Sequence, residues 1–353
     1  MTVFGDRQDD LQRSGAALHA KGKPMASVYI DPALSDDARR DRLYAGDIII
    51  LSATSGSGAL VSLARAMLED AFAPHDPRTV HNHRTPDEVA AVLSTLKPAF
   101  IHHPECKKII SLIMAENGVD LDKLYFDVPR LRSAYPSHFL SSGIAYAFHP
   151  HRDTWYSAPM CQINWWLPIY PLEPDNAMAF YPRYVAEPVE NNSEIYNYYE
   201  WNTKNRAVAA QHVRSDPREQ PKPQQELDPV TMRYLPPPGG VIVFSGAQLH
   251  ETVPNRTDLA RYSIDFRTVH LDDVVAHRGA PNLDSRCTGT TMRDYLRASD
   301  LQKLPDDVVA LYDDGTATAD QVLYFGDRLA GQGAPAPAAA PAHAMRRPGR
   351  HGG

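Results

Sequence analysis

Five short runs of aromatic and β-branched residues, all between positions 143 and 270, constrain the fold of this chain most strongly. They read GIAYAFH, PMCQINWWLPIY, NAMAFYP, GGVIVFS and RYSIDFRTV, and Pro, Gly or Asn residues bound them. Runs of this length and composition are typical of β-strands. Because the strands are short and no helical pattern separates most of them, we expect an antiparallel sandwich or barrel.

The residues before these strands, 1–135, predict a helix-rich N-terminal part that packs on the strand-rich core. The run SGSGALVSLARAMLEDAF places apolar residues at helical spacing. Thr85 and Glu88 form a capping-box pattern at the start of a second helix. A third helix, PECKKIISLIMAE, is expected to end near Gly118, a residue type that favours helix C-termini.

The strand-rich core is assigned to residues 136–330, with an insertion at about 186–230 and with short helical patches, such as TMRDYLRAS, toward its end. Residues 331–353 are rich in Ala, Pro and Gly and are predicted to be disordered, because they offer little that a core could bury.

The overall composition excludes several classes of protein. Hydrophobic residues make up 43% of the 353-residue chain, and the net charge is −7, so a broad face for nucleic acid is not expected. The three cysteines are far apart and form neither a disulfide framework nor a CxxC metal site. No signal peptide and no membrane-spanning run is visible, so we expect a soluble, cytoplasmic protein.

The stretch His149-Pro-His151-Arg152-Asp153 is the strongest candidate for chemistry. Alternate residues of an extended chain point to one face, so His151 and Asp153 can converge while Arg152 turns away. A histidine and a carboxylate on one face supply two thirds of a 2-His-1-carboxylate metal site. The alternation also pairs His149 with His151, so a three-histidine site stays open at this point. In both cases His250, just beyond the apolar run VIVF, is the candidate distal ligand.

The run RYSIDFRTV adds a candidate anion site. In a strand, Arg261 and Ser263 lie on one face, and Tyr262 and Ile264 lie on the other. A guanidinium binds a carboxylate with two parallel hydrogen bonds, and a hydroxyl adds a further donor. Arg267 shares this face and is either a second anion contact or a surface residue.

The order of these residues resembles the Fe(II)/2-oxoglutarate-dependent dioxygenases, and within them the phytanoyl-CoA dioxygenase-like family. The resemblance covers roughly residues 140–270 and includes INWWLPIYPLEPDNAMAFYPRY and VIVFSGAQLHETVPNRTDLARYSIDFR. It implies an α+β fold with a mainly β core, a double-stranded β-helix (jelly roll) flanked by helices. It also implies that Fe(II) is bound by three residues, namely His151, Asp153 and His250.

The same resemblance implies that Arg261, assisted by Ser263, pairs with the distal carboxylate of 2-oxoglutarate. Three residues on one face of the strand after His-x-Asp, namely Gln162, Asn164 and Trp166, are candidates for lining the co-substrate or substrate pocket.

The function expected on these grounds is that of an Fe(II)- and 2-oxoglutarate-dependent oxygenase. It would use O2 to hydroxylate, desaturate or cyclise a small-molecule metabolite, with release of succinate and CO2. The alternative is a cupin-type metal-dependent isomerase or dioxygenase, or a small-molecule-binding jelly roll that does not use 2-oxoglutarate. The cluster Tyr196, Tyr198, Tyr199 and Trp201 in the insertion is either a substrate lid or packing against the barrel.

Overall fold

The computed structural model describes most of the chain. The described residues are 26–140, 145, 149–202, 219–312, 316–317 and 323–324. The tail expected to be disordered lies outside them, as do most of the expected strand GIAYAFH and residues 203–218 of the expected insertion.

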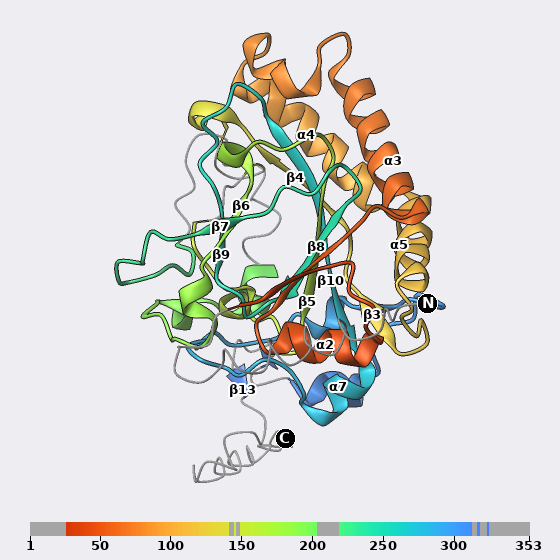
Figure 1. The fold of residues 1–353 in the computed structure, drawn as a ribbon, viewed down its shortest axis with the longest axis vertical. Coiled ribbons are helices and arrows are strands. Elements are labelled where there is room, and N and C mark those ends of the chain that lie inside the picture. Colours follow the sequence, from red (N-terminus) through yellow and green to blue (C-terminus); the bar gives the residue numbers. More distant parts are fainter. Residues whose placement is uncertain are drawn as a thin grey trace, which may run out of the picture.

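An eight-stranded sheet forms the centre of the molecule (Figure 1). Its strands, in spatial order, are β1 (Val28–Ile30), β2 (Ile48–Leu51), β8 (Val241–Ser245), β5 (Ile163–Pro168), β10 (Arg261–His270), β3 (Leu124–Phe126) and β11 (Leu296–Arg297), and β4 (Arg130–Ala134) pairs with β10 beside β3. The expected strands in PMCQINWWLPIY, GGVIVFS and RYSIDFRTV are β5, β8 and β10, which lie next to one another and are antiparallel. These three predictions are therefore confirmed.

A three-stranded sheet faces the large one. It consists of β7 (Met232–Arg233), β6 (Met178–Phe180) and β9 (His250–Thr252), with β6 in the middle. Apolar side chains from both sheets meet between them, and they are Ile48, Trp166, Met178, Phe180, Ile242 and Phe244. The expected jelly-roll core is confirmed by these two facing sheets.

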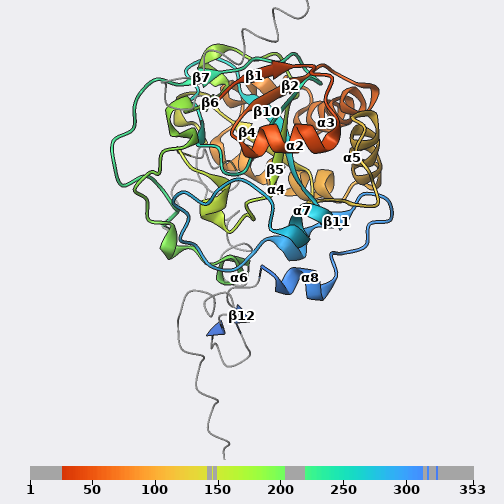
Figure 2. The same ribbon diagram turned by 60° about the horizontal axis from the view of Figure 1, so that its bottom comes forward.

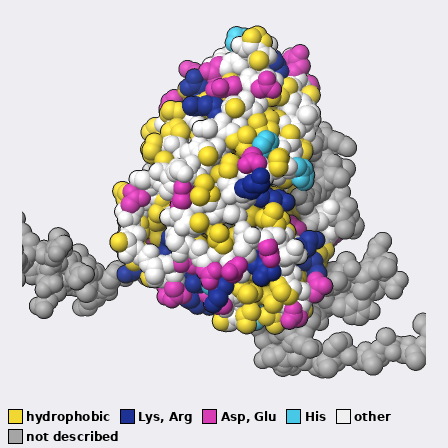
Figure 3. Space-filling model, turned by 90° about the vertical axis from the view of Figure 1, so that its right-hand side faces the viewer, with side chains coloured by type: hydrophobic (Ala, Val, Ile, Leu, Met, Phe, Trp, Pro, Cys, Tyr) yellow, Lys and Arg dark blue, Asp and Glu magenta, His cyan; other side chains and the backbone are white. Residues whose placement is uncertain are grey.

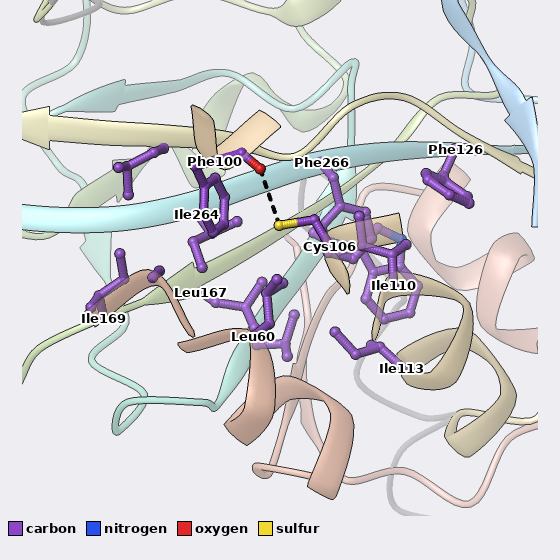
Figure 4. Packing of buried hydrophobic residues seen from close by; sticks show 14 of the residues in the cluster. Leu60, Phe100, Cys106, Ile110, Ile113, Phe126, Leu167, Ile169, Ile264 and Phe266 are labelled. Carbon is purple, nitrogen blue, oxygen red and sulfur yellow. Dashed lines mark hydrogen bonds between the residues drawn. The ribbon is translucent and has the colours of Figure 1, made fainter. Parts of the chain in front are cut away.

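Three helices cover the other face of the large sheet, and all three follow the sequence prediction (Figure 1). They are α3 (Ser55–Phe72), α4 (Pro86–Ile101) and α5 (Pro104–Glu116). The capping box of α4 is formed by Thr85 and Glu88, and Gly118 beyond α5 has a φ of +69°. Figure 4 shows how Phe100 and Cys106 from the helices pack with Ile264 and Phe266 from β10 in the main hydrophobic core.

Alternation along β10 divides the interior into an apolar and a polar half. Tyr262, Ile264 and Phe266 point to the helices and are fully buried in the main core. The residues of the other parity point between the two sheets. The same strand therefore anchors the core with one face and presents polar groups to the interior with the other.

The first 135 residues also contribute four strands, β1 to β4, which the sequence did not predict. Each is three to five residues long. Runs this short carry too few alternations to distinguish a strand from a loop or the end of a helix. Similarly, the expected helical patch TMRDYLRAS is a 3₁₀ turn at Met292–Asp294 followed by strand β11.

Ion pairs connect the N-terminal helix α2 (Asp36–Tyr44) to α7 (Leu271–Ala276), the helix that follows β10 (Figure 2). Arg40 donates to Asp273, and the hydroxyl of Tyr44 donates to the same carboxylate at 2.7 Å. The remaining described elements are α6 (Tyr198–Glu200), α8 (Asp306–Ala310), β12 (Thr316–Ala317) and β13 (Leu323–Tyr324).

Basic and acidic side chains are mixed on the face that Figure 3 shows, with hydrophobic side chains between them. None of the described helices combines the length and the hydropathy that crossing a bilayer requires.

We expect Phe100→Ala to lower the free energy of unfolding by about 3–5 kcal/mol, because it leaves a cavity between α4 and the sheet. Phe100 is 0% exposed. Leu112→Ala on α5 is the control, because Leu112 is 43% exposed and its truncation is expected to change stability by no more than about 0.5 kcal/mol. Thermal unfolding of both variants followed by circular dichroism tests the packing, and equal losses of stability would contradict it.

Candidate metal centre

Two histidines are brought side by side by a backbone bridge. The amide of His151 donates to the carbonyl of His250 at 2.9 Å, and the amide of His250 donates back to His151 at 3.0 Å. His250 begins β9, so this bridge attaches the segment of His151 to the edge of the small sheet. Directly opposed residues of an antiparallel pair point to the same side, and the two ring centroids lie 4.4 Å apart.

The same ring nitrogen of each histidine is hydrogen-bonded to a nearby backbone carbonyl. His151 Nδ1 lies 2.8 Å from the carbonyl oxygen of His149, and His250 Nδ1 lies 2.9 Å from that of Gln248. A carbonyl only accepts, so Nδ1 carries the proton in both rings. With the proton on Nδ1, it is the Nε2 atom of each ring that can offer a lone pair to a metal ion, an arrangement typical of metal-ligating histidines.

Asp153 completes the group as the sequence predicted. Its Oδ1 atom lies 3.5 Å from His151 Nε2 and 4.0 Å from His250 Nε2. The chain is extended through Arg152 and turns at Asp153, the first residue of a 3₁₀ helix (Asp153–Tyr156). The side chain of Arg152 points away and binds Asp284 at 3.0 Å, which anchors the loop.

The donor set fits a divalent metal ion. The three candidate ligand atoms lie within 4.8 Å of one another, and all three residues are buried. Two imidazole lone pairs and a carboxylate oxygen facing one another repel, and a cation between them removes that repulsion. Two histidines and one carboxylate are the set that non-heme Fe(II) oxygenases use.

Electrostatics in the site keep these groups in the form that binds a metal. Burial and the adjacent His151 ring lower the pKa of His250 to about 4, although Asp153 opposes this, so the ring is neutral at pH 7. Burial acts to raise the pKa of Asp153, but the contacts with His151, His250 and Asn164 outweigh it and lower the pKa to about 2. Asp153 is therefore ionised.

His149, the alternative ligand, lies outside this group. Its Nε2 atom is 2.9 Å from the carbonyl oxygen of Pro221, and its own carbonyl orients His151. The geometry thus favours Asp153 over His149 as the partner of His151.

Arg261 is buried at the start of β10, and no carboxylate of the described residues forms an ion pair with it. It is 5% exposed, and its Nη1 atom makes only long hydrogen bonds to the carbonyls of Asn176 and Ala177, at 3.3 and 3.4 Å. Within the described part of the chain, neither Arg261 Nε nor the buried hydroxyl of Ser263 has a hydrogen-bond partner. Burial lowers the pKa of Arg261 to about 10, although Asp265 opposes this.

A cavity of about 350 Å³ extends between the two sheets and joins the three ligand residues to Arg261. Gln162, Asn164 and Trp166 line it, so the face of β5 that the sequence left undecided points inward. The neighbouring Trp165 points to the core, where its ring stacks on Phe266. Trp166 lies beside Arg261, with 5.6 Å between the guanidinium carbon and the ring centroid.

Of the charged wall of this cavity, the sequence had indicated only Arg267, as a possible second anion contact. Its members come from α4, β10, the β3–β4 segment and the 3₁₀ turn before β11, and they are Lys97, Asp127, Arg130, Arg132, Asp265, Arg267 and Asp294. In the β4–β10 pair Arg132 is opposite Ser263 and Arg130 is opposite Asp265, so these side chains share a face. Arg132 binds the diagonal neighbour Asp265 at 2.6 Å. The alternation of Arg130 and Arg132 was visible in the sequence, but nothing there indicated that β4 pairs with β10.

The aromatic cluster of the insertion also reaches the cavity, because Tyr196, Tyr198 and Trp201 line it. The ring of Tyr196 contacts that of Tyr156, and Tyr156 in turn contacts the ring of His151, with centroids 5.1 and 5.5 Å apart. An aromatic path therefore leads from a candidate metal ligand to the insertion.

Comparison with known proteins gives matches among solved structures alone, since no protein-family model and no curated protein matches the chain. EvdO2 from Micromonospora carbonacea var. aurantiaca, complexed with 2-oxoglutarate, is 14% identical with a TM-score of 0.39, over 67% of this chain and 92% of that one. The epimerase SnoN in complex with Fe3+, α-ketoglutarate and nogalamycin RO is 14% identical with a TM-score of 0.36, over 67% and 85%. The non-heme monooxygenase ThoJ is 13% identical with a TM-score of 0.36, over 65% and 76%.

Of these neighbours, ThoJ is named a non-heme monooxygenase and SnoN an epimerase. In the present chain the His-x-Asp…His set lies together in one buried group. With TM-scores below 0.5, the reaction of this chain has to be inferred from its own residues.

Loss of a residue that contacts a metal ligand typically weakens metal binding roughly 10- to 100-fold. We expect His151→Ala and His250→Ala to weaken Co(II) binding by more than that, because each removes a ligand itself. His149→Ala is the matched control, because its carbonyl, which orients His151, is retained. Isothermal titration with Co(II) under anaerobic conditions measures the affinities. A three-histidine site would instead lose affinity in His149→Ala and keep it in Asp153→Ala.

Proposed function

We propose that the protein is an Fe(II)- and 2-oxoglutarate-dependent oxygenase that oxidises a small molecule. Hydroxylation is the proposed outcome, and desaturation or cyclisation would start from the same site. His151, Asp153 and His250 hold the metal ion, which supplies, when bound, the activation of O2 at the expense of the keto acid.

The unsatisfied pair Arg261 and Ser263 is the observation that carries the proposal. An isolated buried cation is costly unless an anion accompanies it, and a buried hydroxyl without a partner adds to that cost. Arg261 lines the same cavity as the three candidate ligands, and Ser263 follows on the same face of β10. A dicarboxylate that places one end at the metal and the other at Arg261 would satisfy both groups.

Aromatic rings pack against two of the polar groups of this site, His250 and Arg261. Phe180 and Phe244 pack against the ring of His250, with centroids 6.1 and 4.9 Å away. Trp166 covers Arg261. In a site with little water, the attraction between the guanidinium and a carboxylate is stronger than at the surface.

The size of the cavity supports a small substrate. Small-molecule sites typically enclose about 300–1,000 Å³, and the cavity of about 350 Å³ has to hold the co-substrate as well. The remaining wall combines charged groups with the aromatic rings of Tyr156, Tyr196 and Tyr198, so we propose a polar organic metabolite as the substrate.

We expect Arg261→Ala to raise the dissociation constant of 2-oxoglutarate about 30-fold or more, because it removes the charged partner of a buried carboxylate. Titrating the anaerobic Fe(II) protein with 2-oxoglutarate and following the visible charge-transfer band measures this constant. Arg233→Ala is the control and should leave the dissociation constant unchanged, because Arg233 lies on β7 and binds Asp175. Equal dissociation constants for both variants and the wild-type protein would exclude Arg261 from the co-substrate site.

Release of succinate tests the reaction itself. We expect the Fe(II) protein to convert 2-oxoglutarate to succinate faster in the presence of its substrate, so a panel of polar metabolites identifies active compounds by succinate formation. Asp153→Ala should abolish the stimulation, since it removes a metal ligand. Succinate formation that no compound stimulates and that Asp153→Ala does not reduce would contradict the proposed reaction.

A further inference from the structure

The two oxygens of Asp153 have different surroundings. Oδ1 faces the two histidines. Oδ2 accepts from the side-chain amide of Gln162 at 2.9 Å and from that of Asn164 at 2.8 Å. The Nε atom of Arg267 lies 3.8 Å from Oδ2. Two hydrogen-bond donors and a nearby guanidinium therefore surround Oδ2, whereas Oδ1 is directed to the metal side.

The direction of each hydrogen bond in this group follows from the charge of Asp153. An ionised carboxylate only accepts, so Gln162 and Asn164 must both turn their NH2 groups toward it. The second hydrogen of the Gln162 amide goes to Asn164 Oδ1 at 2.8 Å. Gln162 Oε1 then faces the other way and accepts from the hydroxyl of Tyr295 at 2.8 Å. Tyr295 therefore holds the carbonyl end of the Gln162 amide while the NH2 end faces Asp153.

Packing prevents these groups from moving apart. Gln162, Asn164 and Tyr295 are at most 5% exposed. Gly246 lies so close to Gln162 that a Cβ atom placed on it would be 3.1 Å from Gln162 Nε2. Arg267 is fixed in turn by Asp127, which accepts from its backbone amide at 2.7 Å and from its Nη1 atom at 3.1 Å.

We propose that Gln162, Asn164 and Arg267 are positioning residues that hold the outer oxygen of Asp153, with Tyr295 fixing the Gln162 amide, so that Asp153 offers the metal one oxygen only. A carboxylate that rotated to bind through both oxygens would occupy a position that a keto acid needs. The proposal rests on the metal site of the proposed function and does not depend on 2-oxoglutarate.

Tyr295→Phe is the sharpest test, because it removes one hydroxyl that touches neither Asp153 nor the metal position. The Gln162 amide then loses the partner that fixes its direction, and we expect the Co(II) affinity to fall roughly 10- to 100-fold. The visible ligand-field spectrum of the Co(II) protein should also change, because the coordination by Asp153 changes. Gln162→Met, which keeps the volume and removes the amide, should change both properties at least as much.

Tyr135→Phe is the matched control, since it removes a buried hydroxyl that lies 2.8 Å from the hydroxyl of Tyr262, on the face of β10 that points to the helices. It should leave the Co(II) affinity and spectrum of the wild-type protein unchanged. The proposal is overturned if Tyr295→Phe binds Co(II) with wild-type affinity and spectrum, or if Tyr135→Phe loses affinity equally. These outcomes are distinct from failure of the proposed function, in which the wild-type protein would bind Co(II) normally but not bind 2-oxoglutarate.

Discussion

The two backbone hydrogen bonds between His151 and His250 are the contact on which the site depends. They join residues nearly a hundred positions apart and fix the rings on one side of a strand pair. Each ring is then oriented by a carbonyl two residues earlier in its own segment. Because backbone groups do this orienting, the arrangement requires only that the strands keep their register and that each histidine stay in place.

Strand β10 links that site to the stability of the fold. Its apolar face holds three helices onto the sheet, and its polar face carries Arg261, Asp265 and Arg267 into the cavity. A shift of one residue in its pairing would exchange these faces, burying charges in the main core. The large hydrophobic core therefore specifies the position of the buried Arg261 and Ser263 as well as the fold. This connection explains how buried cations can be held where no partner in the described chain fully satisfies them.

Elements that depend on local interactions were predictable from the sequence, and elements that depend on contacts between distant segments were not. Helices α3 to α5 and strands β5, β8 and β10 were predictable, since periodicity, capping and alternation are local signals. Spacing alone left both Asp153 and His149 as partners of His151 and His250, and the set His151, Asp153 and His250 was predicted through the resemblance in the order of the motifs. The contribution of β3 and β4 was not, because pairing with β10 is decided by contacts between distant segments. Tyr295 was missed for the same reason, because no pattern in the residues around it indicates a contact with Gln162.

Polar groups in the interior are fully hydrogen-bonded at one end of the cavity and partly unsatisfied at the other, and this contrast indicates where a ligand binds. Around Asp153 every hydrogen bond of the Gln162 amide is satisfied, so the outer side of the metal site is rigid before any metal binds. Around Arg261 and Ser263 polar atoms stay unsatisfied in the described chain. Unsatisfied buried polar atoms lower the stability of the fold, and a bound molecule that satisfies them offsets this loss. A fixed metal-ligating end and an unsatisfied cationic end in one cavity are the requirements of a ligand that chelates through one terminus and carries a carboxylate at the other.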